Sequence, residues 1–136
     1  MSLIVNRFDY TQLSRTSLDG KRVYKCPDGD AVASVTTILD STKDKTHLLE
    51  WRKRVGEQTA KRITKEASGM GTRMHKYIEN YINEGSWGKP GSNPYSQQAF
   101  KMAKTVYENA LKDVNEIWGS EVGLYFPKIY AGTTDC

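Results

Sequence analysis

The sequence lacks the usual marks of secreted and membrane proteins. It contains only two cysteines, Cys26 and Cys136, which lie far apart and form no metal-ligand spacing. Two thiols in a chain of this size favour a reducing compartment over a disulfide scaffold. No apolar run approaches the ~20 residues needed to cross a bilayer, and residues 1–10 lack the basic start and apolar segment of a signal peptide. We therefore expect a cytoplasmic protein with no membrane partner.

The positive charge is confined to one central stretch. The net charge is +4, yet residues 43–76 alone carry ten basic and four acidic side chains, a balance of +6. Residues 1–42 balance to zero, and residues 77–136 carry −2. A local excess of this kind is typical of a surface that binds a polyanion. A helix whose lysines and arginines serve only solubility has the same composition, so both interpretations stay open.

The first half of the chain favours a hairpin followed by helices. Residues 21–35 hold a Pro-Asp-Gly turn between two β-prone runs, which predicts a β-hairpin. Ser34 then occupies the N-cap position of a short helix, VTTILDST. Apolar residues at spacings of three and four predict a second helix over about 46–67. We expect the sequence SGMG, at 68–71, to interrupt or bend it.

The second half favours two more helices and then strands. A third helix is predicted over about 70–83, and a fourth over 96–118 after a loop at 84–94. Two β-prone runs, 121–126 and 129–136, follow. Together with the length of 136 residues, these patterns predict one domain over 1–136, of class α+β (α/β).

The last two β-prone runs, joined by Pro127 and Lys128, predict a hairpin. A two-stranded hairpin is marginal alone, so we expect it to pair with another molecule or to be disordered. A two-residue turn would pair Glu121 with Thr134 and put Glu121 and Asp135 on opposite faces. A three-residue loop, or one bulge, would place Glu121 opposite Asp135, with both carboxylates on one face. The sequence leaves both registers open.

The segment GTRMHKYIE, residues 71–79, has the spacing of a site on a helix. His75 and Glu79 are four residues apart, so on a helix they lie on the same side, beside an apolar face that includes Met74 and Ile78. We expect them to be half-buried, and an imidazole with a carboxylate in this arrangement can hold a divalent metal. An ordinary amphipathic helix with a boundary histidine paired to a glutamate has the same pattern.

Taken in order, these motifs resemble a known family. The helix motif G-x-x-x-H-x-x-x-E at 71–79, Glu121 and the motif Y-A-G-T-x-D at 130–135 resemble the PD-(D/E)XK nuclease superfamily. More narrowly, they resemble its RecB-like exonuclease branch, which includes mitochondrial genome maintenance exonuclease and its phage relatives. The run SVTTIL at 34–39 and the following basic helix are similar to that branch too. The resemblance covers about 23–136 and implies an incomplete restriction-endonuclease-like fold, with an N-terminal hairpin, a helical middle and the start of the core sheet.

The resemblance implies a metal-dependent DNA exonuclease that hydrolyses phosphodiester bonds with Mg²⁺ or Mn²⁺. His75 matches the family's helix histidine, a metal ligand. Asp135 matches the first catalytic aspartate, which bridges metal and scissile phosphate, and Glu121 matches a glutamate that the family often carries there. In the family a D/E-x-K element follows, but this sequence ends one residue after Asp135. We therefore expect the N-terminal portion of a nuclease domain, truncated before that element and inactive unless a second chain supplies the rest.

The expected partner is DNA, single-stranded or at its ends, in repair or recombination, and in the host cytoplasm if the protein is phage-encoded. The expected nucleic-acid contacts are Ser34, Thr36, Arg52, Lys53, Arg54, Arg73 and Lys76. Two other functions remain open: a nucleic-acid-binding module without catalysis, and a helical fragment that binds another protein. Salt-dependent DNA binding separates the protein-binding alternative from the other two.

Overall fold

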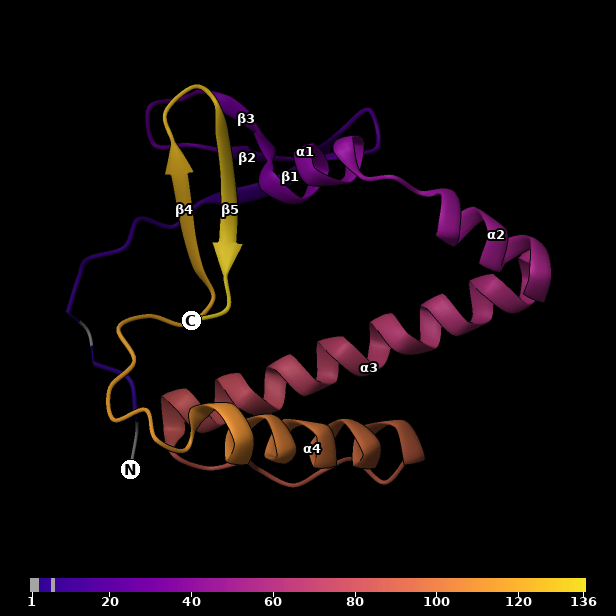
Figure 1. The fold of residues 1–136 in the computed structure, drawn as a ribbon. Coiled ribbons are helices and arrows are strands. Elements are labelled where there is room, and N and C mark those ends of the chain that lie inside the picture. Colours follow the sequence, from indigo (N-terminus) through magenta and orange to yellow (C-terminus); the bar gives the residue numbers. More distant parts are fainter. Residues whose placement is uncertain (1–2, 6) are drawn as a thin grey trace. The chain divides into compact units, whose positions relative to one another are not determined.

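The computed structural model describes residues 3–5 and 7–136, which form two compact units (Figure 1). Residues 3–5 and 45–117 make up one unit, here called the helical unit, and residues 7–44 and 118–136 make up the other, the sheet unit. The predicted mixture of helices and strands is confirmed. The finer prediction of a nuclease fold stays a prediction.

The sheet unit contains one mixed sheet of five strands in the order β1-β2-β3-β5-β4. The strands are β1 Ser14–Leu18, β2 Lys21–Lys25, β3 Ala31–Ser34, β4 Val122–Phe126 and β5 Tyr130–Thr134. Neighbouring strands are antiparallel except β3 and β5, which are parallel. Tyr24, Cys26, Val32 and Ala131 form the buried core of this unit, with Leu13 packed against it.

The predicted N-terminal hairpin is confirmed as β2 and β3. The Asp28 carboxylate accepts a hydrogen bond from the Asp30 N–H at 3.0 Å, and the Cys26 N–H donates to the Asp30 carbonyl at 2.8 Å. Gly29 has a φ of 89°, a conformation that glycine adopts without steric cost. The Pro-Asp-Gly turn therefore forms where the sequence predicted it. The helix α1, Val35–Thr42, follows directly, but Ser34 at its N-cap makes no side-chain capping bond.

The C-terminal hairpin pairs within the chain, whereas the sequence analysis had expected it to pair with another molecule or to be disordered. Strand β5 pairs in parallel with β3, through Ala33↔Tyr130 and Ser34↔Ala131. The C-terminal hairpin thus pairs with the free edge of the N-terminal hairpin. That expectation was wrong because a pairing between segments about 100 residues apart leaves no local signal in either segment.

In the helical unit, the break between helices lies at Gly56 rather than at 68–71. Helix α2, Thr46–Val55, ends there because Gly56 adopts φ 87° and ψ 149°, a region essentially reserved for glycine. Helix α3 then runs from Glu57 to Glu84 without interruption. The prediction of helix over 46–67 is confirmed apart from the break at Gly56, whereas the predicted interruption at SGMG was wrong. Gly69 and Gly71 are tolerated inside α3 because the regular hydrogen bonds of a long helix outweigh their low propensity.

Helices α3 and α4 pack side by side (Figure 1). Helix α4 spans Pro94–Val106 and continues as a π-helical turn, Tyr107–Leu111, so it ends before the predicted residue 118. Ala99 and Ala103 are fully buried and permit close approach of the two helices. The seam also holds an aromatic cluster, made of Tyr77, Tyr81, Trp87, Phe100 and Tyr107.

No helix within residues 3–5 and 7–136 is both long enough and apolar enough to cross a bilayer.

Two glycine substitutions should test the helix boundaries. Gly71→Ala should raise the free energy of unfolding by about 0.5–1 kcal/mol, because alanine has the better helix propensity and its Cβ would meet no atom within 4 Å. Gly56→Ala should lower it by about 1–3 kcal/mol, because alanine is strained at that backbone conformation. Chemical denaturation measures both. Destabilisation by Gly71→Ala would mean that α3 is not continuous through 68–71.

Candidate active site

The turn between β4 and β5 sets the register of the site. The Ile129 N–H donates to the Phe126 carbonyl at 3.1 Å, and Lys128 has a φ of 66°. Proline at the second position and positive φ at the third are typical of a type II turn. The ladder then resumes one residue later, with Phe126↔Tyr130, so three residues separate the paired strands. Of the two registers left open by the sequence, the structure has the one with an extra residue.

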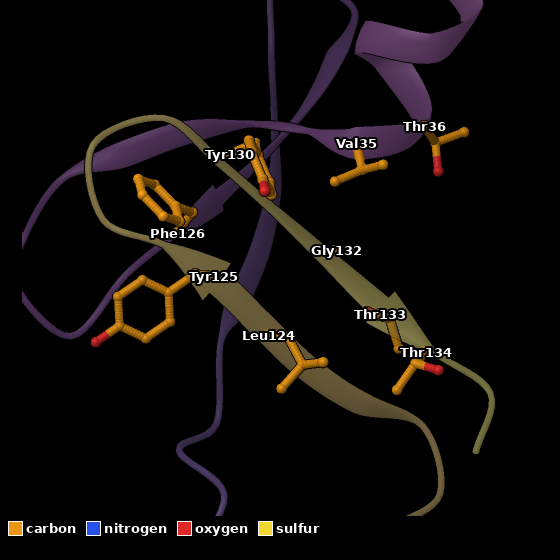
Figure 2. A pocket seen from close by; sticks show the side chains of 9 residues that line it. All are labelled: Val35, Thr36, Leu124, Tyr125, Phe126, Tyr130, Gly132, Thr133 and Thr134. Carbon is orange, nitrogen blue, oxygen red and sulfur yellow. The ribbon is translucent and has the colours of Figure 1, made fainter.

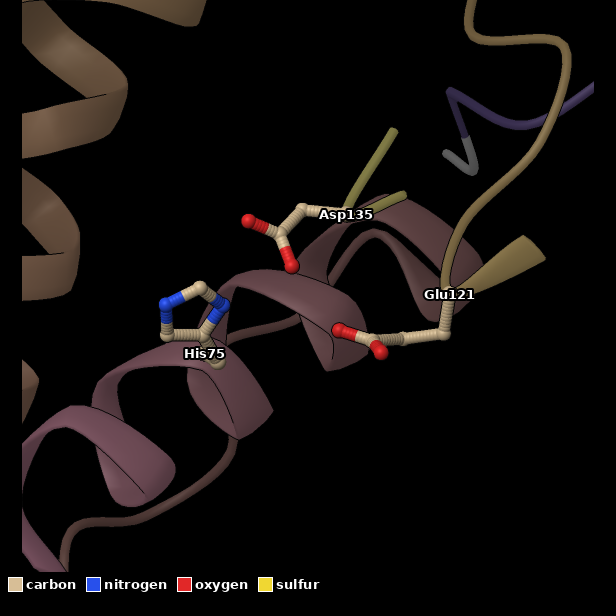
Figure 3. Close-up of side chains that lie close together, drawn as sticks. All are labelled: His75, Glu121 and Asp135. Carbon is tan, nitrogen blue, oxygen red and sulfur yellow. The ribbon is translucent and has the colours of Figure 1, made fainter. Parts of the chain in front are cut away.

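This register places Glu121 opposite Asp135. The ladder reaches Val122↔Thr134, and the Glu121 N–H then donates to the Asp135 carbonyl at 3.0 Å. Directly opposed residues of an antiparallel pair present their side chains to one face. Carboxylate oxygens of the two residues lie within 4.8 Å of each other, and both side chains are exposed (Figure 3). Two acids that are 14 positions apart in the sequence thus become neighbours at one end of the hairpin.

The backbone at Glu121 is unusual. Its φ is 53°, in the left-handed region that non-glycine residues seldom adopt. A residue held there costs on the order of 1–2 kcal/mol, and such strain clusters at functional sites. The strain at Glu121 lies at the point where the carboxylate leaves the regular strand.

The donor set of this pair suits a hard cation. Mg²⁺ binds carboxylate and water oxygens and needs only one or two protein carboxylates. Opposite ligands around Mg²⁺ are about 4 Å apart, twice its ~2.1 Å bond length. The two carboxylates are exposed, and their oxygens lie within 4.8 Å of each other, so small side-chain rotations suffice. Asp135 and Glu121 therefore fit the metal that the resemblance implies.

His75 lies on α3, in the helical unit, and its side chain is exposed rather than half-buried as expected. The sequence pattern paired Glu79 with His75, but the Glu79 carboxylate forms an ion pair with the Lys76 ammonium at 3.1 Å. Because the Glu79 carboxylate is paired with Lys76, the i, i+4 metal pair receives no support.

The predicted basic contacts lie on the two helices α2 and α3. Arg52, Lys53 and Arg54 form the last turn of α2, where positive side chains also stabilise the helix dipole. Arg52 lies 3.8 Å from the Glu57 carboxylate, and its side chain is 37% exposed. Lys53, Arg54 and Arg73 are exposed, so they can reach a phosphate.

The two hydroxyl residues predicted to contact DNA differ in exposure. Ser34 is 1% exposed, because it ends β3 where that strand pairs with β5, and this burial does not favour a DNA contact. Thr36 is exposed and lines a cavity of about 460 Å³ (Figure 2). The cavity's other walls are mostly apolar residues of β4 and β5, including Leu124, Phe126 and Tyr130. Sequence analysis missed this cavity, because its walls come from segments that meet only through the β3–β5 pairing.

One partly buried hydrogen bond helps to hold the hairpin in place. Tyr24, which is 3% exposed on β2, shares a hydrogen bond of 3.0 Å with the Thr133 hydroxyl on β5. Thr133 lies two residues before Asp135, so the bond ties the end of β5 to the core of the sheet unit.

Tyr24→Phe should lower the free energy of unfolding of the sheet unit by about 0.5–1.5 kcal/mol, the net contribution of one such hydrogen bond. Tyr125→Phe, at an exposed tyrosine, is the matched control and should change little. Denaturation of both variants, with and without Thr133→Val, measures the effect. Equal losses for Tyr24→Phe in both backgrounds would show that the bond to Thr133 contributes nothing.

Comparison with known proteins finds no matching family model, no matching curated protein and no matching solved structure.

Proposed function

We propose that the chain carries part of the active site of a metal-dependent DNA exonuclease. The observation that supports this most is the hairpin register, which sets Glu121 opposite Asp135 with carboxylate oxygens within 4.8 Å. The ordered motifs resemble the RecB-like nuclease branch, and this resemblance implies the reaction, hydrolysis of a phosphodiester bond.

In this proposal each residue has a distinct task. Asp135 and Glu121 would hold Mg²⁺ or Mn²⁺, and His75 is assigned as a metal ligand by the resemblance alone. The bound metal would activate the attacking water and neutralise charge on the phosphate. The exposed cations Lys53, Arg54 and Arg73 hold the DNA backbone. The tasks of the family's second acid and lysine are assigned to no residue of this sequence.

The first test is metal binding by the chain itself. Mn²⁺ should bind, with Mg²⁺ as competitor, and Asp135→Asn or Glu121→Gln should each weaken binding by at least about tenfold, since loss even of outer-shell partners costs 10–100-fold. Calorimetric titration measures this. Asp113→Asn, at an exposed acid outside the site, is the control with the same change of charge. Titration of His75→Ala then reports on the imidazole separately.

Cleavage of end-labelled DNA completes this test. The chain alone should release no nucleotides, whereas a fusion that supplies a D/E-x-K strand should do so only with Mg²⁺ or Mn²⁺. Asp135→Ala should abolish release in the fusion. Cleavage by the chain alone that survives Asp135→Ala would show that the active site is placed wrongly, and unchanged Mn²⁺ binding in the Glu121→Gln, Asp135→Asn double variant would reject the metal site.

A second candidate, a nucleic-acid-binding module without catalysis, is favoured by the +6 balance of residues 43–76. Both functions predict that replacing Arg52, Lys53 and Arg54 together by alanine weakens DNA binding. The slope of log affinity against log salt should fall by about 0.7 for each lost contact to a single strand.

Fluorescence anisotropy at several salt concentrations measures that slope. The control is the triple substitution of Lys89, Lys101 and Lys112 by alanine, which removes the same charge from exposed sites outside the central stretch. Affinity and slope that respond equally to both triple variants would contradict a specific role for α2.

A further inference from the structure

A second hollow lies entirely within the helical unit, apart from the carboxylate pair. Its walls are Lys65, Glu66, Ser68, Gly69 and Arg73 of α3, with Tyr95 of α4. Its volume is about 450 Å³, within the ~300–1,000 Å³ typical of small-ligand sites. We call it the Tyr95 groove.

The Tyr95 groove is electropositive. Its one carboxylate, Glu66, is paired with the Arg62 guanidinium at 3.4 Å. No ion pair involves Lys65 or Arg73 within the described chain. Two uncompensated cations therefore face a hollow whose single negative charge is already neutralised, which favours an anionic ligand.

Gly69 allows Arg73 to fold back over the groove. A Cβ placed on Gly69 would lie 3.1 Å from the Arg73 Nη1, tighter than ordinary van der Waals contact. A larger side chain at position 69 would therefore crowd the Arg73 guanidinium. A guanidinium in this position offers several N–H donors in a plane, which suits a phosphate group.

Tyr95 adds an aromatic surface to this charge. It is the second residue of α4, it lines the groove, and it is 45% exposed. The helix start that carries it is fixed by the Asn93 side chain, which accepts a hydrogen bond from the Ser96 N–H at 2.8 Å. Cations together with an exposed aromatic ring are the combination by which proteins hold single-stranded nucleic acid, through phosphate contacts and base stacking.

We propose that the Tyr95 groove binds one nucleotide unit of a single strand, with its phosphate between Lys65 and Arg73 and its base stacked on Tyr95. The inference rests on the nucleic-acid part of the proposed function, and it adds a base-stacking position outside the central basic stretch. It does not depend on the metal site, since none of the groove residues is a proposed ligand.

The stacking contact is tested with three probes in the presence of EDTA: oligothymidylate, an abasic strand of equal length, and thymidine monophosphate. Tyr95→Leu should weaken binding of oligothymidylate by about fivefold or more, the effect expected for one stacked base. Tyr95→Phe keeps the ring and should bind as the unchanged protein does. The abasic strand should not distinguish Tyr95→Leu from the unchanged protein, because it has no base to stack.

The phosphate contact is tested by salt dependence. Lys65→Ala and Arg73→Ala should each reduce the slope of log affinity against log salt by about 0.7. Lys101→Ala, which removes an equal charge from an exposed site on α4 outside the groove, should leave the slope unchanged.

A pair of glycine substitutions separates binding from folding. Gly69→Ala should displace the Arg73 guanidinium and weaken binding of the strand. Gly71→Ala adds the same methyl group to the same helix where no atom lies within 4 Å, so its binding should be unchanged. Because alanine improves helix propensity at both positions, weaker binding by the first variant alone cannot come from unfolding.

Three results would overturn the proposal: equal binding of oligothymidylate by Tyr95→Leu and Tyr95→Phe, unchanged slopes in both cation variants, or thymidine monophosphate binding as tightly as the strand. The last would identify a free nucleotide as the ligand. If the chain passes these tests but does not bind Mn²⁺, nucleotide binding by the Tyr95 groove stands and the exonuclease function is rejected.

Discussion

The candidate active site depends on the parallel pairing of β3 with β5. It joins a three-stranded N-terminal meander to a C-terminal hairpin that would be marginal alone. The pairing buries Ser34 and Ala131 to 1% and 0% exposure and completes the core around Tyr24 and Val32. Because β5 ends at Thr134, this one contact also determines where Asp135 leaves the sheet.

The turn at Pro127 and Lys128 provides the second constraint. Side chains alternate along a strand, so a change of one residue in the register moves a side chain to the opposite face. The positive φ of Lys128 and the extra residue Ile129 bring Glu121 opposite Asp135. The carboxylate pair is therefore a product of turn geometry, and its chemistry, two exposed oxygen donors, follows from that geometry.

The helical unit carries two groups of cationic side chains. Those at the end of α2 also stabilise a helix terminus, so their charge has a structural explanation besides DNA binding. Lys65 and Arg73 have no ion pair in the part of the chain that the structure describes, and they share a hollow with an exposed tyrosine. For this reason the Tyr95 groove makes a sharper prediction about nucleic acid than the overall charge does.

Local patterns in the sequence were sufficient for elements whose cause is local. The Pro-Asp-Gly turn predicted the hairpin of β2 and β3, Ser34 marked the start of α1, and apolar spacing indicated helices through most of 46–83. The strand β1 was missed because all five of its residues are exposed and show no apolar alternation. The break at Gly56 was missed because glycine is also tolerated within helices, as Gly69 and Gly71 are in α3.

For the site, the sequence alone determined which side chains are present: two carboxylates near the ends of β-prone runs, a histidine on a helix and a central excess of cations. Only the tertiary structure decided which of them meet. Parity left the faces of Glu121 and Asp135 open until the turn was known, and Ser34 was buried by a strand from the other end of the chain. Lys65 and Tyr95 line one groove although 30 positions separate them. The physical reason is the same throughout: side-chain chemistry belongs to single residues, whereas proximity depends on backbone contacts between segments that are distant in the sequence.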